Sequence, residues 1–173
     1  MNYAEIKKRD VANGPGVRVS LFVSGCTHRC KGCFNHEAWD FAYGAPFTAQ
    51  TEQDILEALT PAYVQGLTLL GGDPLEKCNA AALLPLVKAV RAMQPKKDIW
   101  CFTGETLEDI WAQNDADKAA LLSMCDVLVD GPYVEEKRNI SLLFRGSENQ
   151  RLIDLEKTRR MGKIVLWEAQ HEN

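Results

Sequence analysis

Residues 17–33 read VRVSLFVSGCTHRCKGC, and this stretch decides how the rest of the chain is interpreted. Its first part, residues 17–23, is rich in β-branched and aromatic side chains and predicts a buried strand. Ser24 and Gly25 end the strand, and three cysteines then follow within eight residues. A strand that runs directly into such a loop would hold three thiols at one point of the fold.

Short apolar runs and amphipathic stretches alternate along the rest of the chain. Further strands are predicted at 66–70, 98–102 and 126–130, each followed by a loop that contains Gly. Residues 163–167 could form a last strand, and the pattern at 151–155 favours neither helix nor strand.

Helical patterns separate these strands. Thr48 or Thr51 could begin the first helix, and Asp54, three residues after Thr51, fits a capping box. Pro85 falls within the second pattern and is tolerable only in a first turn or at a kink. The predicted helical stretches are 55–59, 83–93, 107–112 and 118–124.

Strands that alternate with helices imply right-handed βαβ units and a mostly parallel sheet. The chain holds too few units for a closed eightfold barrel, which usually takes about 250 residues. We therefore predict an α/β fold, an open partial (βα) barrel. In such sheets ligands lie beyond the carboxyl ends of the strands. One mouth should then bring together Cys26–Cys33, Gly71–Pro74, Thr103–Gly104 and Asp130–Gly131.

Composition narrows the class of protein. The 173 residues suit one globular domain, and 46% of them are hydrophobic. A net charge of −4 with scattered basic residues predicts no nucleic-acid partner and no membrane partner. Residues 1–10 lack the pattern of a secretory signal, and no apolar run approaches the roughly 20 residues that span a bilayer. We expect a cytoplasmic protein whose six cysteines are thiols or metal ligands.

Cys26, Cys30 and Cys33 are separated by three and by two residues, so one tight loop can wrap a single metal centre. Thiolates suit both iron–sulfur clusters and zinc. Around a four-iron cubane, this loop would leave one iron open to an exogenous ligand. Alternatively, His36 could complete a closed Cys3His zinc site in a binding module without catalysis. Spacing alone leaves both interpretations open.

The Cys-x3-Cys-x2-Cys pattern directly after the first strand resembles the signature of radical S-adenosylmethionine (SAM) enzymes. The resemblance implies a 4Fe–4S cluster held by Cys26, Cys30 and Cys33, with the amino and carboxylate groups of SAM on the fourth iron. One electron from the reduced cluster would cleave the sulfonium bond and give a 5′-deoxyadenosyl radical, so that the cofactor carries the hard chemistry. It also implies that Gly32, Cys33 and Phe34 contact the adenine of SAM.

Gly71-Gly72-Asp73-Pro74, about forty residues later at a strand end, resembles the Gly-Gly-Glu-Pro element of the same enzymes. There the exposed backbone accepts hydrogen bonds from the SAM amino group, and glycine permits the close approach. The resemblance implies that Gly71, Gly72 and Asp73 bind SAM, mainly through backbone because Asp replaces Glu. Asp130 is a further candidate, for SAM or a cation, and its alternative role is to cap a loop or helix.

Two further segments narrow the resemblance. They are Asn13-Gly-Pro-Gly-Val-Arg18, before the first strand, and Phe144-Arg-Gly-Ser-Glu-Asn-Gln-Arg151, near the end of the chain. With the cysteine and glycine loops, they are similar to a family of glycyl-radical enzyme activases, the anaerobic ribonucleoside-triphosphate reductase activating proteins, over roughly residues 5–155. We expect a radical SAM domain at 1–155 and an extension of uncertain structure at 156–173.

This resemblance implies an oxidoreductase that works without oxygen and needs no catalytic side chain beyond the cluster and SAM. The radical would remove a hydrogen from a glycine in the large subunit of the reductase and leave a stable glycyl radical. Reduced flavodoxin or a similar donor would supply the electron, and a homodimer could join the reductase in a heterotetramer. A pyruvate formate-lyase activase and a deazapurine synthase share the cysteine loop and remain alternatives.

Overall fold

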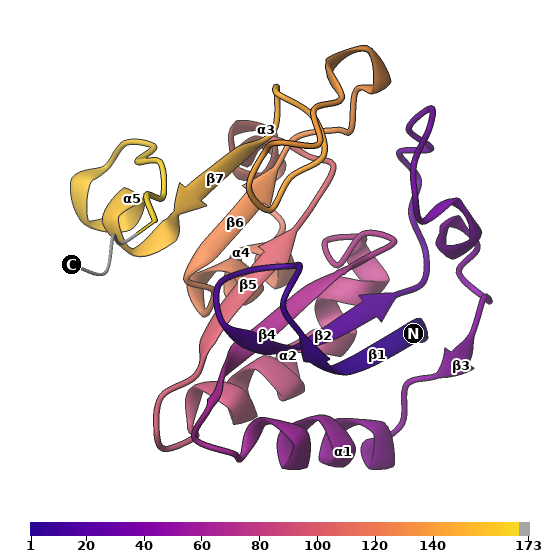
Figure 1. Ribbon diagram of the computed structural model, residues 1–173, viewed down its shortest axis with the longest axis vertical. Helices are drawn as coiled ribbons and strands as arrows, with labels where there is room; N and C mark the ends of the chain where they lie inside the picture. Colours follow the sequence, from indigo (N-terminus) through magenta and orange to yellow (C-terminus); the bar gives the residue numbers. More distant parts are fainter. Residues whose placement is uncertain (170–173) are drawn as a thin grey trace.

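A computed structural model describes residues 1–169, and a seven-stranded sheet forms its centre (Figure 1). The order across the sheet is β3-β1-β2-β4-β5-β6-β7. Strands β2, β4, β5 and β6 are parallel, whereas β1, β3 and β7 are antiparallel to their neighbours. This arrangement confirms the predicted α/β fold with an open, mostly parallel sheet. The strands are β1 (Asn2–Asp10), β2 (Val17–Val23), β3 (Ala45–Pro46), β4 (Val64–Gly71), β5 (Asp98–Phe102), β6 (Val127–Asp130) and β7 (Arg151–Asp154).

The helices follow the predicted patterns, and the structure decides two points that the sequence left open. Helix α1 begins at Thr48 rather than Thr51, because the Thr48 hydroxyl accepts from the Thr51 N–H and the Thr51 hydroxyl accepts from the Thr48 N–H. Pro85 lies inside α2 and not in its first turn, where its missing N–H leaves one helical hydrogen bond unmade. The helices are α1 (Ala49–Leu59), α2 (Lys77–Arg91), α3 (Leu107–Gln113), α4 (Ala116–Ser123), α5 (Leu155–Met161) and the short 3-10 turns η1 (His36–Trp39) and η2 (Glu135–Lys137).

Sequence patterns missed the two strands at one margin of the sheet and misread the end of the chain. Strand β1 is mostly half-exposed or exposed and carries charged side chains, so it lacks the apolar run that marks the inner strands. Residues 163–167 form no strand: Leu166 makes a single bridge with Ile153, and the Trp167 N–H donates to the Leu152 carbonyl (2.8 Å). The undecided stretch 151–155 divides into β7 and the start of α5.

The two faces of the sheet are covered differently, which positions the site. On one face, Leu21, Leu69 and Ile99 are fully buried in a core built with the helices. Because successive residues of a strand point to opposite faces, the neighbours of these residues lie on the other face. There Phe22 and Leu70 line a pocket that loops enclose. The second face is therefore the open interior of a partial barrel.

The described part of the C-terminal extension packs onto this second face. The Trp167 ring lies edge-on to Trp100, with centroids 5.0 Å apart, and 6.2 Å from the ring of Phe144. Together with Val127 and Val129 of β6, these rings form a small core of their own. The last part of the extension, 170–173, lies outside the described residues.

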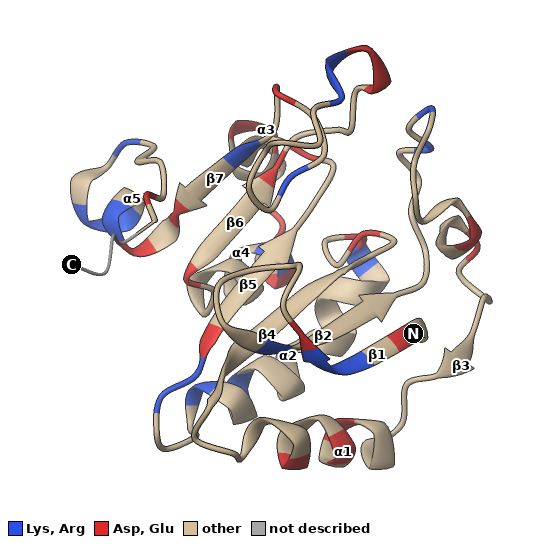
Figure 2. Ribbon diagram, in the orientation of Figure 1, with Lys and Arg blue, Asp and Glu red and all other residues tan. Residues whose placement is uncertain are grey.

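Two further features of the described chain are the distribution of its charged residues and the length of its helices. Figure 2 shows acidic and basic residues interspersed over the ribbon, with basic residues gathered on α5 and near the end of α2. Within residues 1–169, no helix is both long enough and apolar enough to cross a membrane.

Candidate functional site

A pocket of about 490 Å³ opens at the carboxyl ends of the parallel strands. Its floor includes Phe22, Leu70 and Phe102 from the open face of the sheet. The loops after four strands meet in it, as the parallel order predicts. Phe34 lies on its rim and is 73% exposed. The residues at and after these strand ends that line the pocket include Cys26, His28, Cys30, Cys33, Gly71, Gly72, Asp73, Thr103, Gly104 and Gly131.

The cysteine loop is held in a tight conformation by its backbone. The Gly25 N–H donates to the Ala38 carbonyl (2.7 Å), which ties the start of the loop to η1. The Cys33 N–H donates to the Cys30 carbonyl (3.2 Å), and Gly32 between them has a φ of 75°. A left-handed residue inside so short a turn favours glycine. Gly32 thus shapes the loop, and the structure does not place it in the pocket lining.

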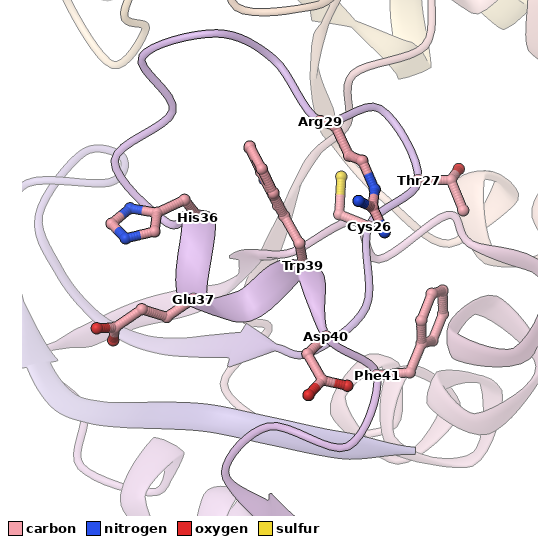
Figure 3. A pocket seen from close by; sticks show the side chains of 8 residues that line it. All are labelled: Cys26, Thr27, Arg29, His36, Glu37, Trp39, Asp40 and Phe41. Carbon is pink, nitrogen blue, oxygen red and sulfur yellow. The ribbon is translucent and has the colours of Figure 1, made fainter.

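A second pocket, of about 470 Å³, reaches Cys26 from the side of η1. Figure 3 shows the Trp39 indole standing beside Cys26, whereas His36 and Glu37 point away from it. His36 does not line the first pocket, where Cys30 is found. The four ligands of the alternative zinc site are therefore not brought together.

The spacing of the sulfur atoms also helps to distinguish a site for an iron–sulfur cluster from a site for a single zinc ion. Thiolates around one tetrahedral zinc, each about 2.3 Å from the metal, lie within about 4 Å of one another. Within residues 1–169, only Cys26, His28 and Asp73 form a group of three possible ligands whose donor atoms all lie within 4.8 Å. The sulfurs of Cys26, Cys30 and Cys33 therefore do not all lie within 4.8 Å of one another. Thiols that lie farther apart than the ligands of one zinc ion suit the larger iron–sulfur cluster, and all three cysteines of the loop are free.

The glycine loop packs directly on the start of the cysteine loop. A Cβ on Gly71, whose φ is 104°, would lie 2.7 Å from the Val23 nitrogen, and one on Gly72 would lie 2.5 Å from the Gly25 carbonyl oxygen. Backbone bonds fill the same space, since the Gly72 N–H donates to the Val23 carbonyl (2.7 Å) and the Asp73 N–H to the Gly25 carbonyl (2.8 Å). Only glycine permits this approach.

The Asp73 side chain is more involved than the sequence predicts. The residue is 2% exposed, and its Oδ2 accepts hydrogen bonds from His28 Nε2 (2.8 Å), the Thr103 hydroxyl (2.9 Å) and the Gly104 N–H (3.0 Å). Its Oδ1 accepts from the Leu75 N–H (2.8 Å). One buried carboxylate therefore joins the loops that follow β2, β4 and β5.

The protonation of two groups beside the pocket reflects this environment. Burial raises the pKa of the Cys26 thiol to about 11, and the charge of Asp73 adds to that rise. The hydrogen bond to Asp73 raises the pKa of His28. Because a thiol must lose its proton to bind a metal, loading this site would release a proton at Cys26.

Asp130 does not reach the pocket. The residue is 1% exposed, and its carboxylate accepts from Arg151 Nε (3.0 Å), Arg151 Nη2 (2.6 Å) and the Leu107 N–H (2.8 Å). Arg151 also contacts Glu108, and both carboxylates raise its pKa. Asp130, at the end of β6, thus pairs with Arg151 and accepts a hydrogen bond from the first residue of α3. It is not among the residues that line the pocket.

The segment 144–151 supplies pocket residues whose contacts could not be read from sequence. Arg145, Gly146 and Gln150 line the pocket. The Gln150 side chain accepts from the Gly146 N–H (2.9 Å) and donates to the Gly131 carbonyl (3.1 Å). In the sequence, only the polar character of residues 144–151 pointed to this segment. Tyr133 also lines the pocket, and its ring centroid lies 6.3 Å from that of Phe34. Nothing in the sequence marked Tyr133 as a pocket residue.

Comparisons with known proteins agree with this site. A family model described as a 4Fe-4S single cluster domain matches residues 12–153. The anaerobic ribonucleoside-triphosphate reductase-activating protein of Pasteurella multocida is 47% identical over 152 residues, which cover 87% of this chain and 95% of that protein. The proteins of the same name from Enterobacteria phage T4 and Escherichia coli strain K12 are 45% and 42% identical, over 93% and 96% of their own lengths.

These matches confirm the predicted iron–sulfur domain, and the family model spans the cysteine loop, the glycine loop and nearly all of the pocket lining. They run over nearly the whole length of each relative. The chain therefore belongs to the family of anaerobic ribonucleoside-triphosphate reductase-activating proteins.

Proposed function

We propose that this protein activates an anaerobic ribonucleoside-triphosphate reductase by generating a glycyl radical on its large subunit. The observation that carries the proposal is the meeting of three free cysteine thiols and a close-packed glycine loop at one pocket. The named activity of relatives that are 47% and 45% identical over 87% and 88% of this chain supports it. The same relatives favour this activity over a pyruvate formate-lyase activase or a deazapurine synthase.

In this proposal Cys26, Cys30 and Cys33 hold a 4Fe–4S cluster, and SAM occupies the pocket beside them. When bound, these two groups supply the one-electron cleavage of SAM on which the activation depends. The chain itself binds and orients them. Carbonyl groups at Gly71–Asp73 accept from the SAM amino group, and the Gly32–Phe34 turn faces the adenine. Asp130 supports the wall through Arg151 instead of touching SAM.

The apolar floor has a separate part in the proposal. Phe22, Leu70 and Phe102 cover the open face of the sheet below the cysteines. A dry surface of this kind keeps water and unintended hydrogen donors away from a reactive radical. The glycine-bearing segment of the reductase is proposed to reach this pocket, and Arg145 and Gln150 in its lining are the proposed polar contacts for that segment.

The wider assembly is also part of the proposal. The partner is the reductase subunit that bears the glycine, and an electron donor such as reduced flavodoxin serves the cluster in the cytoplasm. A homodimer joins the reductase in a heterotetramer. Residues 1–155 form the radical SAM domain, and the packing of Trp167 on Trp100 suggests that the extension stabilises it.

The test is the radical itself. Anaerobically reconstituted, reduced protein is mixed with SAM and the reductase, and electron paramagnetic resonance is expected to show a glycyl radical. With pyruvate formate-lyase in place of the reductase no radical is expected, and the reverse pattern would overturn the assignment. Cys30→Ala should abolish the signal. Cys78→Ala is the matched control, because Cys78 is an exposed cysteine outside the loop, and it should leave the signal unchanged.

A further inference from the structure

We propose that His28 is a positioning residue, which holds the cysteine loop against the glycine loop by donating a hydrogen bond to the Asp73 carboxylate. The proposal rests on the proposed function, because a bound cluster is what gives the position of the thiols its importance. The proposal gives a role to two side chains, His28 in the cysteine loop and Asp73 in the glycine loop. The backbone contacts expected with SAM require neither of these side chains.

The direction of the bond follows from the chemistry of its partners. An ionised carboxylate only accepts hydrogen bonds, so His28 Nε2 must carry the proton in the 2.8 Å contact with Asp73 Oδ2. Thr103 and Gly104 donate to the same oxygen from the loop after β5. His28 is thus one of three donors that converge on a single buried atom, and the other two come from the loop after β5.

The imidazole is also held from the side. A Cβ on Gly104 would lie 2.6 Å from His28 Cδ2, so the ring rests against the bare backbone of that glycine. The His28 side chain remains 26% exposed. A ring clamped on one face and bonded at Nε2 has little freedom, as a positioning role requires.

A second contact acts on the same stretch of loop. The Thr27 N–H and the Thr27 hydroxyl both donate to Glu76 Oε1, each at 2.6 Å. Thr27 and His28 both lie between Cys26 and Cys30. The carboxylates of Glu76 and Asp73, which both follow β4, therefore hold the backbone that joins two of the three thiols. This half of the loop is therefore tied to the sheet through side chains.

The other half of the loop has weaker ties. Lys31 lies 3.6 Å from a carboxylate oxygen of Glu135, and its side chain is 82% exposed. An exposed ion pair of this kind contributes little, whereas hydrogen bonds to a buried charge are much stronger. The structure therefore assigns the strongest side-chain restraint on the cysteine loop to His28, and Thr27 adds hydrogen bonds to the more exposed Glu76.

One competing role for His28 needs a test of its own. Donor atoms of Cys26, His28 and Asp73 lie within 4.8 Å of one another, so His28 could instead ligate a metal. The two roles predict different behaviour of His28→Gln. The amide nitrogen of glutamine can occupy the place of Nε2 and donate to Asp73, but glutamine does not replace imidazole as a metal ligand.

The experiment compares His28→Ala and His28→Gln with the unaltered full-length chain and with the control His36→Ala, whose imidazole points away from Cys26. Hydrogen exchange at the amides of 26–30 is measured before cluster loading. Loss of iron to a chelator is measured after anaerobic reconstitution. His28→Ala is expected to speed exchange about tenfold and iron loss about 10- to 100-fold. His28→Gln should recover most of both, and His36→Ala should match the unaltered chain.

Equal behaviour of His28→Ala and the unaltered chain would overturn the proposal. Failure of His28→Gln to improve on His28→Ala would also overturn it, because the imidazole itself would then be required. An unaltered chain that takes up no iron would contradict the proposed function instead. The exchange measurement would still test the positioning role in that case, since it needs no cluster.

Discussion

Asp73 and Asp130 look alike in sequence, yet the fold uses them differently. Each lies at or just beyond the carboxyl end of a parallel strand, and each is at most 2% exposed. Asp73 faces the pocket and accepts hydrogen bonds from three loops. Asp130 lies outside the pocket lining and pairs with Arg151. The same residue type thus organises the site in one case and stabilises the wall in the other.

The neighbouring strand explains the difference. β4 is followed across the sheet by parallel β5, which delivers its own terminal loop, with Thr103 and Gly104, to the same edge. β6 is followed by antiparallel β7, whose first residue, Arg151, lies opposite Asp130. A parallel neighbour supplies neutral donors from a loop, whereas an antiparallel neighbour here supplies a cation. Strand direction therefore decides which carboxylate stays available to the site.

The largest effect should come from removing the Asp73 carboxylate. Asp73→Ala leaves His28 and the Leu75 and Gly104 N–H groups without their acceptor, so cluster retention should fall about 10- to 100-fold. Iron and sulfide content after reconstitution measures this, with circular dichroism as a check on folding. Asp73→Asn, which preserves volume and one acceptor oxygen, should lose less. Asp130→Asn is the matched control and should keep its cluster; equal losses would break the comparison.

A smaller, purely structural effect is expected at the other carboxylate. Arg151→Ala leaves the buried Asp130 charge without its cation, which should lower the free energy of unfolding by about 3 kcal/mol. Denaturant unfolding of the chain before cluster loading measures this loss. Iron uptake at low temperature should be unchanged. A variant of full stability that fails to retain iron would show that Asp130 and Arg151 belong to the cofactor site.

The smallest effect concerns Glu108, the exposed partner of Arg151. The hydrogen bond from Arg151 lowers the pKa of Glu108 below its usual 4.5, so the bond stabilises the fold above that pH and the gain is lost as pH falls through the lower, folded value. Glu108→Gln should therefore cost less than about 1 kcal/mol at neutral pH and nothing in strong acid. Paired unfolding curves across this range would detect it. A difference that grows on acidification would contradict the ion-pair account.

Much of the fold could be predicted because its inner strands are nearly continuous apolar runs. β2 and β5 have the predicted bounds, and the ends of β4 and β6 differ from prediction by one or two residues. β1 could not be found in this way, since it is held by pairing with β2 and presents charged residues to solvent. Residues 163–167 have a strand-like composition but make only a single bridge.

The site likewise has parts that could be predicted from the sequence and parts that could not. The cysteines and glycines are local motifs, and their meeting at one edge follows from strand order. The role of Asp73 was not predictable, because its donors, His28 and Thr103, are 45 and 30 residues away in the chain. The pairing of Asp130 with Arg151 likewise required the direction of β7, which the undecided pattern at 151–155 did not give.

The most direct test of the account is metal and sulfide analysis of the anaerobically purified chain beside its Cys26→Ala, Cys30→Ala and Cys33→Ala variants. The account predicts iron and inorganic sulfide in near-equal amounts in the unaltered chain and a severe loss of both in each variant. Zinc at one ion per chain, without sulfide and lost on His36→Ala, would contradict it.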